Sequence, residues 1–231
     1  MKKELKFAFL RTIPVMLGYL FLGIAFGLLL QKAGYNFLWA LGISTFVYAG
    51  SIQFVLISFL GGGVSLLSAA LMTLSINSRH MFYGLSFIEK FKSMKKTGAY
   101  MVFSLTDETY SLLFSTRVPE ELNEKRTLFY ISLLNQIYWV SGSVAGAVAG
   151  ELILFDTTGI DFAMTALFVV IFVEQWISGK VHIAALLGML CGVISLMIFG
   201  PGQFILPALL ATIALLMLLK EQIKKREEAA S

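Results

Sequence analysis

Long apolar runs dominate this sequence and constrain what it can fold into. They cover residues 13–30, 37–60, 64–88, 98–115, 128–150, 160–176, 181–199 and 204–219. A run of about 20 apolar residues is long enough to cross the hydrocarbon core of a bilayer as an α-helix. Only 14% of the residues are charged, against about 25% in soluble proteins. The sequence therefore predicts an all-α, polytopic transmembrane helical bundle with about 6–8 membrane segments.

The distribution of charge predicts one integral membrane domain over residues 1–231. A basic N-terminus (residues 1–12) and a charged tail (residues 220–231) flank a membrane bundle (residues 13–219). Lys and Arg near span ends stay on the cytoplasmic side, so we expect both termini to be cytoplasmic. The net charge of +4 comes from short tracts between apolar runs, which suits a lipid bilayer as the partner and not a nucleic acid.

One basic loop distinguishes two arrangements of the segments. Residues 89–97 contain four lysines, and they lie between the runs 64–88 and 98–115. If both runs cross the membrane fully, this loop lies outside, against the tendency of Lys and Arg to remain inside. If neither crosses fully, the loop is cytoplasmic. We favour the second arrangement, in which these two runs are discontinuous or re-entrant, over eight plain spans.

Both of these runs carry charges near their centres. Asn77-Ser78-Arg79-His80 interrupts the first run, and Thr106-Asp107-Glu108-Thr109 interrupts the second. A charged side chain at mid-bilayer costs roughly 2.5–3.5 kcal/mol on insertion scales, so such residues need partners. We expect Arg79 to pair with Asp107 or Glu108. A structural ion pair, or charges at the membrane interface that reach water, are the alternatives.

A cavity bounded by a guanidinium and carboxylates has the polarity of a free amino acid, which presents a carboxylate and an ammonium. The predicted substrate-binding residues are Gln53, Asn77, Arg79, Asp107 and Asn135, and the predicted proton-coupling residues are Glu108 and His80. Gln53 follows Ala49-Gly50-Ser51, where small residues let a helix unwind. Hydrogen bonds between helices are the alternative role for the amide side chains, and packing is the alternative for His80.

Enzyme chemistry finds little support in the sequence. The chain has two histidines, no H-E-x-x-H motif, no G-x-S-x-G motif and no Walker-type loop. We therefore expect no catalytic residues, no metal and no cofactor. A non-transporting membrane subunit, or a channel-like or regulatory protein, remains the rival to a transporter.

Glycines at four-residue spacing predict close contact between helices. The pairs Gly23/Gly27 and Gly188/Gly192 and the series Gly142, Gly146 and Gly150 follow the small-xxx-small pattern. This pattern lets helix backbones approach closely, within one chain or against a partner.

Three segments in order carry a family resemblance. They are Tyr48-Ala49-Gly50-Ser51-Ile52-Gln53-Phe54, the stretch from Asn77-Ser78-Arg79-His80 through Ser86, and Thr106-Asp107-Glu108-Thr109-Tyr110. The chain resembles the AzlC-type branched-chain amino acid permeases, also called the azaleucine-resistance or LIV-E exporters, over roughly residues 5 to 220. The resemblance implies efflux of leucine, isoleucine, valine and related amino acids across a bacterial inner membrane. It also implies coupling to the proton gradient and a small membrane subunit of AzlD type.

Overall fold

The computed structural model describes residues 2–62, 64–152, 162, 165–166, 169, 172–173, 176–177, 182–200 and 204–221. The side chains of residues 79, 81, 82, 85, 96, 205 and 206 are not part of this description. Within it the chain is helical and contains no β-strand. The helices are α1 (Lys2–Lys32), α2 (Phe37–Phe46), α3 (Gly50–Leu60), α4 (Leu66–Leu85), α5 (Ile88–Lys92), α6 (Lys96–Phe103), α7 (Asp107–Ser115), α8 (Glu124–Leu152), α10 (Ile183–Phe199) and α11 (Ile205–Leu218).

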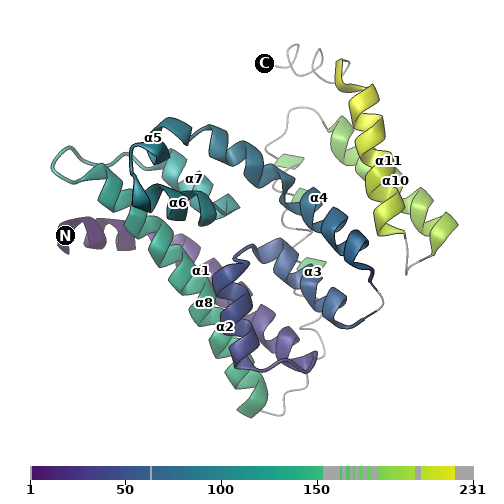
Figure 1. Ribbon diagram of the computed structural model, residues 1–231, viewed down its shortest axis with the longest axis horizontal. Helices are drawn as coiled ribbons and strands as arrows, with labels where there is room; N and C mark the ends of the chain where they lie inside the picture. The colour runs from purple at the N-terminus through teal and green to yellow at the C-terminus, as the bar shows by residue number, and fades with distance from the viewer. Residues whose placement is uncertain are drawn as a thin grey trace. The chain divides into compact units, whose positions relative to one another are not determined.

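The chain divides into two compact units, whose helices are labelled in Figure 1. The first comprises Met1–Gly63 and Ile76–Ala163, and the second comprises Val64–Ser75 and Met164–Ser231. In the second unit α10 and α11 pack side by side. Among the described side chains of α10, only Cys191 and Ser195 are buried. The polar residues singled out by the sequence, apart from the tail, belong to the first unit.

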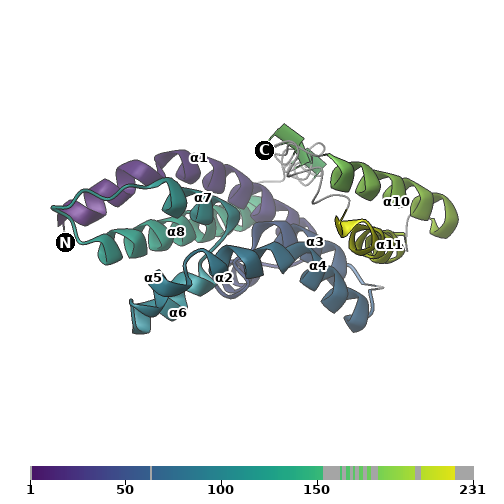
Figure 2. The ribbon, with the colours of Figure 1, turned by 90° about the horizontal axis from the view of Figure 1, so that it is seen from above.

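Helices α1 and α8 form the frame of the first unit and run side by side in Figures 1 and 2. The Gly23 backbone faces Trp139 and Gly142, and the Gly146 backbone lies against Ile24. Residue numbers rise together along both helices, so the two are parallel. A Cβ on Gly142 would stand 2.9 Å from the Leu20 carbonyl oxygen, which explains why small residues occur here.

The run expected over residues 37–60 is not one helix. It consists of α2 and α3, separated by a break at residues 47–49. Tyr48 in this break has φ of +40°, a left-handed conformation that is uncommon for a residue with a Cβ. Phe54 on α3 packs edge-to-face against Phe26 of α1, and the Tyr35 hydroxyl lies 3.5 Å from the Leu60 oxygen. Both ends of the α2–α3 pair therefore lie beside the C-terminal end of α1.

The run expected over residues 98–115 is also divided, into α6 and α7. The break covers residues 104–106, immediately before the charged pair that the sequence singled out. Met101 of α6 and Leu113 of α7 belong to one buried cluster with Leu128 and Ile131 near the start of α8. Both helices of this pair therefore pack beside the N-terminal half of α8.

Basic residues from three parts of the chain gather at that end of the first unit. The Lys90 ammonium lies 2.8 Å from Glu124 Oε1, and the Lys125 ammonium donates to the Ser93 oxygen at 2.9 Å. Ala8 of α1 joins the same buried cluster as Phe91. The loop that contains Lys90 therefore lies at the same end as the start of α1 and the start of α8.

Helix α4 runs without interruption through Asn77 and His80. The run is therefore continuous as far as Leu85, without the break expected within it. Within the described part of the chain, α1 alone combines the length and the mean hydropathy of a membrane span, whereas α8 is nearly as long and carries more polar residues. The other apolar helices there contain 10–17 residues in their apolar parts.

Candidate functional site

Gln53 holds the break between α2 and α3. Its Oε1 accepts from the Ala49 amide at 3.1 Å and from Trp139 Nε1 at 3.0 Å, while its Nε2 donates to Ser44 Oγ at 3.2 Å. The side chain is fully buried. Gln53, predicted from the sequence to bind substrate, is thus bonded to the backbone and side chains that shape the break.

Thr106 begins α7. Its side chain accepts from the Thr109 amide at 3.3 Å and so caps one of the free N–H groups of the helix. Asp107 and Glu108 occupy the first turn, where carboxylates offset the positive end of the helix dipole. The sequence Thr-Asp-Glu-Thr therefore starts a helix at the break and presents carboxylates there.

Tyr19 links this helix start to α1. Its hydroxyl donates to Glu108 Oε2 at 2.8 Å and lies 2.6 Å from Thr106 Oγ1. Tyr19 is buried, whereas Glu108 is exposed. The hydroxyl therefore fixes one carboxylate oxygen of Glu108 at the edge of a buried polar region.

Asn135 of α8 also contacts the first turn of α7. Its Nδ2 donates to Thr109 Oγ1 at 3.0 Å, and that oxygen lies 2.9 Å from Thr106 Oγ1. The Tyr48 side chain, from the other break, faces Tyr19 and Thr109. We refer to the six residues that meet here as the central cluster: Tyr19, Tyr48, Thr106, Glu108, Thr109 and Asn135.

Among the described residues, three buried hydroxyl or amide oxygen atoms at or beside the central cluster have no hydrogen bond. They are the Tyr48 hydroxyl, Asn135 Oδ1 and the hydroxyl of Ser132, which lies one turn before Asn135 on α8. Tyr48 is 3% exposed and Asn135 is fully buried. A buried polar atom without a partner costs about 1–3 kcal/mol, so each one calls for an explanation.

The structure brings together only part of the set that the sequence predicted. Asn135 and Glu108 belong to the central cluster, and Asp107 precedes Glu108 in the first turn of α7. Asn77 and His80 lie on α4, where the His80 ring packs edge-on against Tyr83 at 5.6 Å. The side chain of Arg79 lies outside the described residues, so its pairing stays a prediction.

Sequence reasoning missed Tyr19, Tyr48 and Thr109. Tyr48 and Thr109 stand in segments that carry the family resemblance, but the sequence assigned neither a role, and Tyr19 lies in an apolar run where a single hydroxyl is unremarkable. The nearest signal for Tyr48 was the Ala49-Gly50-Ser51 tract that follows it. No local pattern marks Tyr19, because only the packing of α1 against α7 gives its hydroxyl a role.

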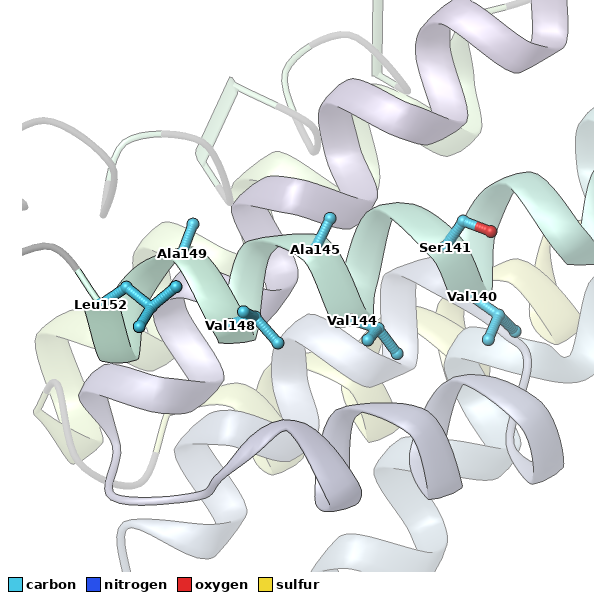
Figure 3. Close-up of a pocket in the computed structure, with 7 residues that line it drawn as sticks. All are labelled: Val140, Ser141, Val144, Ala145, Val148, Ala149 and Leu152. Atoms are coloured by element: carbon cyan, nitrogen blue, oxygen red, sulfur yellow. The ribbon is translucent and has the colours of Figure 1, made fainter.

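A second feature of the first unit is an open hollow along α8, shown in Figure 3. Its volume is about 640 Å³. The residues that line it are Val140, Ser141, Val144, Ala145, Val148, Ala149 and Leu152. Ser141 has their only polar side chain, so this set offers little to recognise a charged solute. No group of three or more His, Cys, Asp or Glu side chains that could hold a metal occurs among the described residues.

Comparison with known proteins identifies relatives over most of the chain. The family model described as "AzlC protein" matches residues 14–153. The branched-chain amino acid transport protein AzlC of Bacillus subtilis is 40% identical over 95% of this chain and 87% of its own length. An uncharacterised membrane protein of Helicobacter pylori is 41% identical over 96% of this chain and 97% of its own. The inner membrane protein YgaZ of Escherichia coli is 28% identical over 79% and 78%. No solved structure matches.

Proposed function

The chain belongs to the AzlC family, and from this premise we propose that it is a secondary transporter that exports branched-chain and related hydrophobic amino acids. Membrane transport in general follows from the family. The relatives are named as transport or membrane proteins, which agrees with the expectation that the chain is not an enzyme. The substrate class is proposed from the printed function of the Bacillus relative.

The meeting of two broken helix pairs at the central cluster is the observation that carries this proposal. Secondary transporters commonly bind solutes where discontinuous helices expose backbone and polar side chains near mid-membrane. Here α3 and α7 both begin at breaks, and Tyr48 and Thr106 bring the breaks to one place. Asn135 lies about 16 Å along α8 from Glu124, roughly half the thickness of a hydrocarbon core.

We propose that the basic end of the first unit is cytoplasmic. The proximity of Lys90 to Glu124 and of Lys125 to Ser93 supports this orientation, because it joins three basic tracts at one side. In a bacterial cytoplasmic membrane, α1 and α8 then cross outward from that side. The two chain termini are proposed to be cytoplasmic as well.

Two segments are proposed to be re-entrant. Residues 96–115 would enter from the cytoplasmic side and return to it, in line with the sequence-based expectation. Residues 37–60 would enter and return at the opposite side, and α4 would cross. The sequence alone suggested 64–88 as the second such segment, and the two-helix arrangement of 37–60 is the reason for the change.

We propose that the substrate and the coupled protons bind at and around the central cluster. Asn135, Asn77 and Asp107 are proposed to line the substrate cavity, with Arg79 receiving the substrate carboxylate. Glu108 is proposed to carry the proton, and His80 to assist it. The hydrogen bond from Tyr19 to Glu108 Oε2 supports the role of Glu108, since loss or gain of a proton there alters the central cluster directly.

A small membrane subunit of AzlD type is proposed as the partner, on the basis of the family resemblance. Leucine flux in proteoliposomes, measured with and without that subunit under an imposed pH gradient, tests these proposals. Outward flux that depends on the gradient is expected. Absence of amino-acid flux in both preparations would refute the transport proposal and favour a regulatory or channel-like subunit. Flux without the partner would refute only the proposal that the small subunit is needed.

A further inference from the structure

The unpartnered oxygens of the central cluster indicate what kind of group it lacks. Asn135 donates through Nδ2 to Thr109 Oγ1, so its free atom is Oδ1, which can only accept a hydrogen bond. The Tyr48 hydroxyl can also accept. An acceptor buried this completely, at 0% exposure for Asn135, requires a donor to offset its desolvation.

Both atoms lie against the first turn of α7. Asn135 reaches it through Thr109, and the Tyr48 side chain faces Thr109 and Tyr19. The other polar atoms here are the hydroxyls of Tyr19 and Thr106. Apart from Asn135 Nδ2, which donates to Thr109 Oγ1, these functional atoms are oxygens, and the Glu108 carboxylate adds negative charge to them. An oxygen-lined, negatively charged site suits a small monovalent cation with several donors.

We propose that Asn135 Oδ1 and the Tyr48 hydroxyl bind the α-ammonium group of the transported amino acid. This inference rests on the proposed function and adds to it the end of the substrate that these residues recognise. An ammonium carries three donors, and the Glu108 carboxylate supplies the third acceptor. The same oxygens also suit Na⁺, so the experiment separates the two cations.

Binding of labelled leucine to the purified full chain provides the test, with two analogues as competitors. 3-Methylbutylamine retains the ammonium of leucine without the carboxylate, and 4-methylpentanoate retains the carboxylate without the ammonium. In Asn135→Leu and in Tyr48→Phe, leucine affinity is expected to fall about tenfold to a hundredfold, the effect of losing a hydrogen bond to a charged group. Competition by the amine is expected to be lost while competition by the carboxylate persists.

Two further variants keep the result interpretable. Asn135→Asp retains acceptor oxygens and is expected to retain the amine competition, which Asn135→Leu loses. Tyr138→Phe is the matched control for Tyr48→Phe, because it also removes a buried hydroxyl, one that lies 3.1 Å from Thr12 Oγ1. Tyr138→Phe is expected to leave leucine binding unchanged.

Equal loss of competition by the amine and by the carboxylate in the Asn135 and Tyr48 variants would overturn the inference. It would also be overturned if Asn135→Asp lost the amine competition as Asn135→Leu does. A third contrary result is that leucine binding requires Na⁺ and that the variants change only this Na⁺ requirement. If the unaltered chain binds no branched-chain amino acid at all, the proposed function itself fails and this inference falls with it.

Discussion

Replacing Gln53 with Leu is expected to destabilise the protein through the break between α2 and α3. Leucine has a similar size and no acceptor, so the Ala49 amide and Trp139 Nε1 both lose the oxygen they donate to. Each buried donor left without an acceptor costs about 1–3 kcal/mol, and together they cost about 2–6 kcal/mol. On the smaller scale measured for polar contacts within a membrane protein, the sum is about 1 kcal/mol.

A double-mutant cycle with Trp139→Phe isolates one of these two bonds. In the Trp139→Phe background only the Ala49 amide loses its partner, so Gln53→Leu is expected to cost about 1–3 kcal/mol less than in the original chain. The free energy of unfolding is measured by denaturant titration in detergent, followed by far-UV circular dichroism. This readout detects helix content and does not depend on tryptophan fluorescence.

Two results would contradict this reasoning. Equal cost of Gln53→Leu in both backgrounds would mean that the hydrogen bond between Gln53 and Trp139 contributes nothing. Unchanged stability with loss of leucine binding would favour the role that the sequence predicted for Gln53, direct contact with the substrate.

Three other predictions follow from the same arrangement. Glu108→Gln is expected to abolish leucine flux driven by a pH gradient and to preserve exchange at equal pH, because glutamine cannot carry a proton; uphill flux with only a proton gradient would exclude Glu108 as the carrier. A cysteine at Ser93, with Cys191→Ala, is expected to react with an impermeant reagent from the cytoplasmic side only, and labelling from outside would restore eight plain spans. Gly146→Ala is expected to lower the free energy of unfolding by about 1–3 kcal/mol, because its Cβ meets the Ile24 backbone. Gly188→Ala has open space within 4 Å and serves as the control; equal effects would show that close packing of α1 and α8 is not responsible.

Some of this protein could be predicted from the sequence because local patterns determine it. Apolar runs alone led to an all-helical membrane protein, since a backbone in hydrocarbon must satisfy its own hydrogen bonds. The four-residue spacing of Gly142 and Gly146 predicted close helix contact, and α1 packs there. The interruption at Thr106 and Asp107 was also visible, because charged residues stand there in the middle of an apolar run.

The central cluster could not be predicted in the same way, because its members become neighbours only when α1, α7 and α8 pack. Asn135 stood out as a polar residue in an apolar run, yet its partner Thr109 is 26 positions away in the sequence. Tyr19 lies 89 positions from Glu108 and carries no local mark of its role. Gln53 was noticed for its polarity, but the tertiary structure decided that its oxygen supports Ala49 and Trp139. Hydrogen bonds depend on distances of about 3 Å and on direction, and packing between helices sets those distances, whereas sequence periodicity specifies only which faces are apolar.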